Sequence, residues 1–324
     1  MDGAVDGLID VVVTRRRDEA EGIVGLELAA ADGTPLPAFD AGAHVDLHLP
    51  AALGGWVRPY SLCGDPADPA RYRLAVLREP ASRGGSAAVQ AQLHAGVALR
   101  IGRPRQHFPL SPDARRHLLL AGGIGMTPLL AMAQALARQG ADFELCCFAR
   151  SREHLAFAEA LREPALAPHV RLHFDHPSEP QKIDLGRLLA EPAAGTHLYV
   201  CGPAGFMQAV RAAAAQWPEE AVHTEYFAPP ASSDAGEDSP FELVLARRGI
   251  TVPVAAGQSA VGALHELGLD IPTSCEQGLC GTCVVDLLDG EAEHRDHCLS
   301  SAERRHRLAL CCSRARSPRL VLDL

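Results

Sequence analysis

The spacing of the cysteines near the C-terminus restricts the possible fold more than any other feature of this chain. Six of its ten cysteines lie in the last fifty residues. Cys275, Cys280 and Cys283 form a C-x4-C-x2-C pattern, and the adjacent Cys311 and Cys312 follow. A loop with this spacing can turn several thiolates inward around one compact metal centre, so the surrounding structure has to be built around that loop.

The pattern matches the spacing of plant-type [2Fe–2S] proteins. The alternative is a zinc site, in which Cys280 and Cys283 form a knuckle that His294 or His297 completes. The position of Cys275 is unusual for zinc, and no second C-x2-C knuckle follows. The sequence therefore favours the cluster, with the fourth ligand at position 311 or 312.

Hydrophobic periodicity divides the chain into further parts. Residues 1–110 contain short strands with turn signals and no long helix, which predicts a β-barrel. Residues 111–228 alternate strands with helices, one of them at 154–163, which predicts a doubly wound parallel α/β domain. Residues 229–239 have the composition of a linker. Residues 240–324 predict a small α+β unit of a size that benefits from a metal.

Composition and charge exclude several classes of function. The net charge of −10, with two Trp and four Tyr, disfavours binding to nucleic acid. The uncharged stretch at 118–137 contains glycines and a proline that suit a strand, a turn and a helix better than a membrane span. Acidic residues stand where a signal peptide would be basic, so we expect a cytoplasmic protein with no membrane partner.

Two turns in the α/β part predict a pyrophosphate site. AGGIGMTP at 121–128 lies between a predicted strand and helix, where glycines admit a pyrophosphate and Thr127 is the expected N-cap. CGP at 201–203 follows a later strand, and both turns would lie at the carboxyl ends of strands. Together the two turns resemble the NAD(P)-binding half of ferredoxin reductase-like proteins. A buried core thiol is the alternative for Cys201. The predicted residues are Gly122, Gly123, Gly125, Thr127, Cys201, Gly202 and Pro203.

Three segments resemble the flavin-binding elements of ferredoxin reductase-like proteins. RPYSL at 58–62 resembles the R-x-Y-S motif, which assigns Arg58 to the flavin phosphate, Tyr60 to the isoalloxazine face and Ser61 to its N5 edge. SRGGS at 82–86 resembles a phosphate loop, and EYF at 225–227 stands where an aromatic residue covers the flavin. The implied further residues are Arg83, Gly84, Gly85, Ser86 and Phe227, with Tyr226 as the alternative to Phe227.

The order of these motifs resembles the phthalate dioxygenase reductase-like family, which includes vanillate O-demethylase reductases. The resemblance implies FMN, a C-terminal β-grasp ferredoxin domain, and Cys311 as the fourth cluster ligand. It places Cys201 beside the nicotinamide and Arg150 on the adenosine side. Asp175 suits a free ribose hydroxyl and thus NADH, whereas Arg150 with Arg152 would suit NADPH.

These cofactors together predict electron transfer. A nicotinamide delivers two electrons as hydride, a [2Fe–2S] cluster accepts one, and a flavin converts between them without a protein acid or base. The resemblance implies a reductase that passes electrons from NADH through FMN and the cluster to a transiently bound terminal oxygenase of the Rieske type. The alternative is a free-standing NAD(P)H flavin reductase or dehydrogenase whose cluster is structural or senses redox state.

Overall fold

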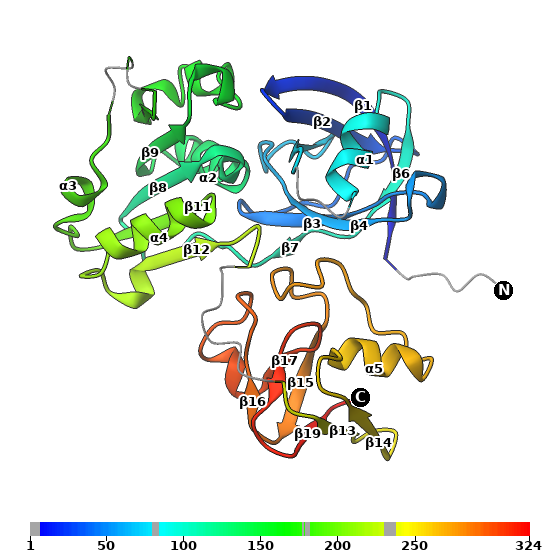
Figure 1. Ribbon diagram of the computed structural model, residues 1–324. Coiled ribbons are helices and arrows are strands. Elements are labelled where there is room, and N and C mark those ends of the chain that lie inside the picture. The colour runs from blue at the N-terminus through cyan, green and yellow to red at the C-terminus, as the bar shows by residue number, and fades with distance from the viewer. Residues whose placement is uncertain (1–6, 80–83, 177, 179–181, 230–237) are drawn as a thin grey trace. The chain divides into compact units, whose positions relative to one another are not determined.

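The computed structural model describes residues 7–79, 84–176, 178, 182–229 and 238–324 (Figure 1). The chain divides into two compact units, residues 1–227 and 228–324. The first unit contains two sheets with separate strand sets, and the second contains a mixed sheet and a two-stranded ribbon. Within the described residues, no helix is both long and apolar enough to cross a membrane.

The first sheet is antiparallel and barrel-like. Its strands follow the order β4-β3-β6-β1-β2-β5, and β7 pairs with β3. Alternating apolar side chains such as Val11, Leu26 and Leu47 fill its interior. The elements are β1 (Ile9–Ala20), β2 (Ile23–Ala30), β3 (Ala43–His48), η1 (Ala51–Leu53), β4 (Val57–Ser61), β5 (Tyr72–Leu77), α1 (Gly85–Gln92), β6 (Ala98–Ile101) and β7 (Arg105–Gln106).

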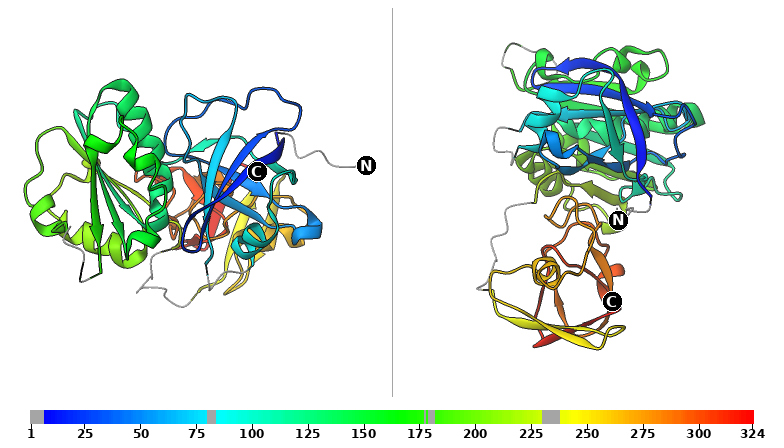
Figure 2. Two further views of the ribbon diagram at one scale, coloured as in Figure 1. Left: turned by 90° about the horizontal axis from the view of Figure 1, so that it is seen from above. Right: turned by 90° about the vertical axis from the view of Figure 1, so that its right-hand side faces the viewer.

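The second sheet is parallel and doubly wound, with the order β10-β9-β8-β11-β12. Leu119 and Tyr199 pack towards α2, while the alternate residues Leu118 and Val200 pack towards α4, so helices cover both faces (Figure 2). The strands are β8 (Arg116–Gly122), β9 (Asp142–Ala149), β10 (Val170–Phe174), β11 (Thr196–Cys201) and β12 (Val222–Glu225), and the helices are α2 (Met126–Gln139), α3 (Leu185–Leu189) and α4 (Ala204–Ala213).

Two local expectations in this part are wrong. The helix expected at 154–163 is replaced by the turns η3 (Arg152–His154) and η4 (Ala160–Arg162). Phe157 lies between them with φ +60°, and its side chain is buried in the core, so packing overrides the helical pattern. Thr127 is not an N-cap, because α2 begins at Met126 and the Thr127 hydroxyl donates to the carbonyl of Ile124 at 3.1 Å.

The second unit packs one helix on a mixed sheet of order β14-β13-β19-β15-β17. Leu243, Leu264 and Leu320 lie in its core, and Ser259 caps α5 by accepting from the N–H of Gly262 at 3.0 Å. The loop between α5 and β15 carries the three closely spaced cysteines. The elements are β13 (Phe241–Leu245), β14 (Ile250–Val254), α5 (Ala260–Glu266), β15 (Val284–Asp289), β16 (Ala292–Glu293), η7 (Glu303–Arg305), β17 (Arg307–Ala309), β18 (Arg314–Ala315) and β19 (Arg319–Leu322).

The first described residues after the gap at 230–237 are bound to this second unit. Arg295 Nη1 donates to the carboxylate of Asp238 at 2.8 Å. Arg314, whose side chain is buried, donates from Nη2 to the carbonyl of Ser239 at 2.8 Å. Two residues of the predicted linker therefore have fixed positions on the second unit.

Candidate functional site: a flavin–nicotinamide junction and a cysteine loop

The two glycine turns of the α/β part meet where strand order reverses. β8 ends at Gly122 beside Cys201, the last residue of β11. A Cβ at Gly125 would lie 2.2 Å from the carbonyl oxygen of Cys201, and a Cβ at Gly202 would lie 3.0 Å from Gly122 Cα. Only glycine permits this contact, which brings the predicted nicotinamide residues together at a switch point of the sheet.

The chain exposes backbone at one end of this junction and buries a thiol at the other. Gly123 has φ +53°, and a Cβ there would meet no atom within 4 Å. Pro203 stands at the N-cap of α4. Cys201 is fully buried, and burial raises the pKa of its thiol well above the ordinary value. Cys201 therefore remains a neutral thiol at physiological pH.

Arg150 and Asp175 lie side by side at the carboxyl ends of β9 and β10. The N–H of Asp175 donates to the carbonyl of Ala149 at 3.1 Å, and the N–H of His176 donates to that of Arg150 at 3.2 Å. Arg150 and Asp175 are exposed. The predicted adenosine-side residues thus occupy the same sheet edge as the glycine turns.

β4 places the R-x-Y-S residues beside the start of α1. A Cβ at Gly85 would lie 3.1 Å from Arg58 Nε, so the glycine leaves room for the arginine. Burial raises the pKa of Tyr60 to about 12, which keeps its hydroxyl protonated. Ser86 Oγ accepts from the N–H of Glu79 at 3.3 Å. Arg83, which the sequence also assigns to the flavin phosphate, lies outside the described residues.

Glu225 is the residue that the sequence did not single out. Ser61 Oγ donates to Glu225 Oε2 at 3.3 Å, across 164 positions of sequence. Glu225 ends β12 and pairs in register with Cys201. Burial raises the pKa of its carboxyl to about 8, with a smaller opposing effect from Ser61. A carboxyl group that is protonated at neutral pH thus joins the flavin strand to the nicotinamide strand.

The two aromatic candidates after Glu225 differ in their surroundings. Tyr226 packs against the core under α4, and its hydroxyl accepts from Arg211 Nη1 at 3.3 Å. Phe227 has 40% of its side chain exposed, which is high for a large apolar group. Phe227 is thus the more accessible of the two rings.

The cysteine loop directs backbone N–H groups at sulfur. The Sγ of Cys275 accepts from Gln277 N and Leu279 N, each at 3.3 Å. Gly278 N donates to Cys311 Sγ at 3.3 Å, and Gly278 has φ +72°. Such donors stabilise sulfur carrying negative charge, as thiolates bound to iron do.

The thiols of the loop interact with one another, and Cys311 forms hydrogen bonds with Cys275 as well as with Cys283 and Cys312. Cys275 raises the pKa of Cys280 by a hydrogen bond between the thiols, and Cys311 lowers the pKa of Cys283 in the same way. Cys312 also lies close to the loop, because a Cβ at Gly278 would lie 2.5 Å from its Sγ. The donor set and its N–H groups thus fit a [2Fe–2S] cluster ligated by Cys275, Cys280, Cys283 and Cys311.

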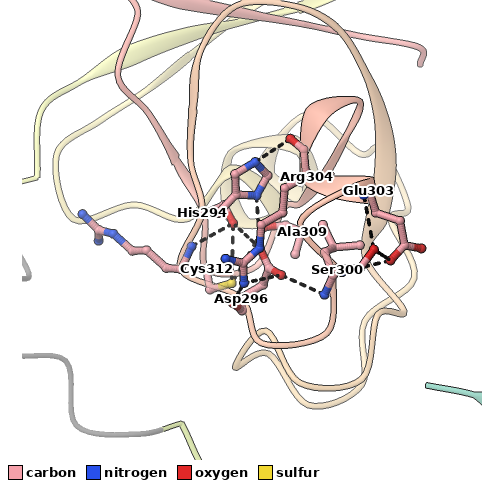
Figure 3. Close-up of polar contacts among 10 residues, drawn as sticks. His294, Asp296, Ser300, Glu303, Arg304, Ala309 and Cys312 are labelled. Carbon is pink, nitrogen blue, oxygen red and sulfur yellow. Dashed lines mark hydrogen bonds and ion pairs between the residues drawn. The ribbon is translucent and has the colours of Figure 1, made fainter. Parts of the chain in front are cut away.

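A buried carboxylate, that of Asp296, lies in a polar network with His294 and Arg304 (Figure 3). The side chain of Asp296 is 0% exposed. It accepts from Leu299 N at 3.0 Å and lies 3.2 Å from His294 Nδ1 and 3.5 Å from Ser313 Oγ. Arg304 Nη2 donates to the backbone carbonyl of Asp296 at 2.5 Å.

This network reaches the cysteines through the backbone. The N–H of His297, next to Asp296, donates to the carbonyl of Gly278 at 2.8 Å. Gly278 in turn donates to Cys311, so the carboxylate fixes a segment that holds the cluster loop. The sequence gives no signal for this role, because Asp296 stands within the polar run 294–297.

Comparisons with known proteins agree with this geometry. The family model "2Fe-2S iron-sulfur cluster binding domain" matches residues 243–316, and "Dimethylamine monooxygenase subunit DmmA-like, N-terminal domain" matches residues 102–221. The vanillate O-demethylase oxidoreductase of Pseudomonas sp. (strain HR199 / DSM 7063) is 46% identical over 98% of this chain and 100% of its own length. The solved phthalate dioxygenase reductase is 36% identical, with a TM-score of 0.72 over 98% of each chain. The chain belongs to the phthalate dioxygenase reductase-like family.

This membership confirms the predicted class of fold, enzyme and cofactor. The chain is an NAD(P)H-dependent flavin iron–sulfur oxidoreductase with FMN, a [2Fe–2S] cluster and a nicotinamide as its cofactors, and it is a reductase component for an oxygenase. An intact type IV self-sufficient cytochrome P450 monooxygenase contains a similar part, which is 39% identical with a TM-score of 0.88. That match covers 98% of this chain and 41% of the larger one.

Proposed function

We propose that this chain passes electrons from NADH through FMN and the [2Fe–2S] cluster to a separate Rieske-type oxygenase or demethylase, which it binds transiently. The domain scheme we propose is an FMN-binding barrel at 1–110, an NAD-binding domain at 111–228, a linker at 229–239 and a ferredoxin domain at 240–324. The bound FMN supplies the exchange between the electron pair of a hydride and the single electrons of the cluster.

The hydrogen bond from Ser61 to Glu225 is the observation that carries the proposal. It joins the strand with the flavin motif to the strand end that pairs with Cys201. A flavin edge at Ser61 and a nicotinamide at Cys201 would therefore share one junction. The neutral forms of Cys201 and Glu225 place no fixed charge there, so neither group opposes the approach of a hydride donor.

Each remaining residue has a role that its chemistry suits. Arg58 with Gly84, Gly85 and Ser86 holds the flavin phosphate, together with Arg83, and Phe227 covers the ring. Gly122, Gly123 and Gly125 hold the pyrophosphate in a turn that Thr127 stabilises through its bond to Ile124, while Gly202 and Pro203 hold the nicotinamide end. Arg150 and Asp175 hold the adenosine ribose, and the carboxylate favours NADH over NADPH. We assign the protein to the cytoplasm, where its cysteines stay out of disulfide bonds.

An anaerobic titration with NADH, followed by extraction of the flavin, tests this function. We expect absorbance changes from both a flavin and a [2Fe–2S] centre, with FMN in the extract. The proposal would be contradicted if the chain contained zinc, or if NADPH but not NADH reduced its flavin.

A second measurement separates the proposal from the free-standing reductase. Cys275→Ser should abolish reduction of the oxygenase or cytochrome c while NADH still reduces the flavin. If the variant reduces these acceptors as fast as the original chain, the cluster is not in the electron path.

A further inference from the structure

Trp56 stands immediately before β4, outside the R-x-Y-S pattern. The N–H of Leu49 donates to the carbonyl of Trp56 at 2.8 Å, so the pairing of β3 with β4 continues to this residue. Side chains alternate along a strand. Trp56, Arg58 and Tyr60 therefore share one face, the face that carries the flavin motif.

The indole ring is half-buried, and two glycines lie against it. A Cβ at Gly54 would lie 2.5 Å from Trp56 Nε1, and one at Gly84 would lie 3.2 Å from Cζ2. Both glycines have positive φ, +97° and +112°, which other residues rarely adopt. The two glycines thus hold the ring between η1 and the start of α1.

Arg58 stacks on this ring. Its Cζ lies 4.8 Å from the Trp56 ring centroid, within cation–π distance. The same arginine lies against Gly85, the first residue of α1, whose first-turn N–H groups have no partner within the helix. The ring and a hydrogen bond from Arg58 Nη1 to the carbonyl of Val57 at 2.7 Å orient the guanidinium beside the first turn of α1, so two kinds of anion-binding group lie next to each other.

We propose that Trp56 is a positioning residue that holds the Arg58 guanidinium at the start of α1 and so makes the site prefer a flavin with a phosphate over one without. The inference rests on the proposed flavin site at Arg58. An unstacked arginine samples many rotamers and loses entropy on binding a phosphate, whereas a stacked one is already oriented.

Flavin binding to the full-length apoprotein tests this role. We expect Trp56→Leu to weaken FMN binding about fivefold to tenfold, the size of one cation–π contact, and to change riboflavin binding by less than about twofold. Trp56→Phe keeps a weaker π face and should lie between the two. The measured quantity is the ratio of the riboflavin Kd to the FMN Kd.

A double-mutant cycle with Arg58→Gln isolates the pair. Arg58→Gln should by itself lower the ratio of the riboflavin Kd to the FMN Kd. Adding Trp56→Leu to this variant should lower the ratio no further. Trp217, the other tryptophan, is buried in the α/β part and donates to the carbonyl of Leu189, so Trp217→Phe is the matched control and should leave the ratio unchanged.

The outcomes separate the inference from the proposed function. If Trp56→Leu weakened the binding of FMN and of riboflavin equally, Trp56 would only support the barrel and the inference would be overturned. Equal affinities of the original chain for the two flavins would overturn it as well, together with the phosphate site at Arg58. Reduction of the bound flavin by NADH would stand in both cases, and its failure alone would overturn the proposed function.

Discussion

The cysteine loop and the flavin–nicotinamide junction are built in opposite ways. The loop takes three of its four sulfurs and most of its N–H donors from residues 275–283. The junction joins Ser61, Cys201 and Glu225 from three separate strands. The loop surrounds sulfur with donors that favour charge, whereas the junction buries a thiol and a carboxyl that stay neutral. The charged centre in the cysteine loop is thus formed by residues close together in sequence. The uncharged junction is formed by residues that only the packing of distant strands brings together.

The largest effect is expected at the fourth cysteine of the loop. Cys311→Ser should prevent assembly of the cluster, because Cys311 accepts from Gly278 and pairs with Cys283. Cys312→Ser is the matched control and should retain it. Iron content and the visible spectrum of the purified chain measure the result. Retention of the cluster by the Cys311 variant and loss by the Cys312 variant would reverse the ligand assignment.

At the junction, stability should depend on pH through Glu225. Its pKa is raised to about 8 in the folded chain, so from about pH 4.5 to pH 8 only the unfolded chain loses the proton. Stability therefore falls as the pH rises through this range, and no such penalty exists below it. Glu225→Gln should become more stable than the original chain by about 2–4 kcal/mol at pH 8.5, allowing for partial solvent access.

Denaturant unfolding at several pH values measures this difference. Glu220, exposed in the turn at Glu219–Ala221, provides the control, and Glu220→Gln should follow the original chain throughout. If the difference in the free energy of unfolding between Glu225→Gln and the original chain were the same at pH 5 and pH 8.5, the Glu225 carboxyl would not be held neutral.

The contact between the glycine turns should tolerate no side chain. Gly125→Ala puts a methyl group 2.2 Å from the carbonyl oxygen of Cys201, so we expect a loss of about 1–3 kcal/mol and slower flavin reduction by NADH. At Gly205 a Cβ meets nothing within 4 Å, and Gly205→Ala should match or slightly exceed the original stability. Thermal unfolding and stopped-flow reduction test both variants. If NADH reduced the flavin of the Gly125→Ala variant at the original rate, this would argue against a nicotinamide at this junction.

The smallest effect is expected at Asp296. Asp296→Asn keeps the shape but weakens the side-chain contacts with Leu299, His294, Ser313 and Arg304, which should cost about 1–3 kcal/mol and shift the reduction potential of the cluster. Asp286→Asn, at a carboxylate with 58% of its side chain exposed, should change stability by less than about 0.5 kcal/mol. Spectroelectrochemistry would detect the shift, and an unchanged potential would limit Asp296 to a structural role.

The contrast also explains what the sequence could predict. Three of the predicted cluster ligands are visible because spacing within one loop encodes them, whereas only the family resemblance distinguishes Cys311 from Cys312. The turns at Gly122 and Cys201 are visible because each follows a buried strand. Glu225 is invisible because its importance arises only when β12 pairs with β11 and faces Ser61. The helix expected at 154–163 fails for a related reason, since the burial of Phe157 depends on neighbours far away in sequence.

The attachment of Asp238 and Ser239 to the second unit limits how far the two units can separate. The eleven peptide steps from Phe227 to Asp238 span at most about 40 Å when fully extended, whatever path they take. A tether of this length gives an effective concentration in the millimolar range. Delivery of electrons from flavin to cluster is then intramolecular, so its rate should not change when the protein is diluted.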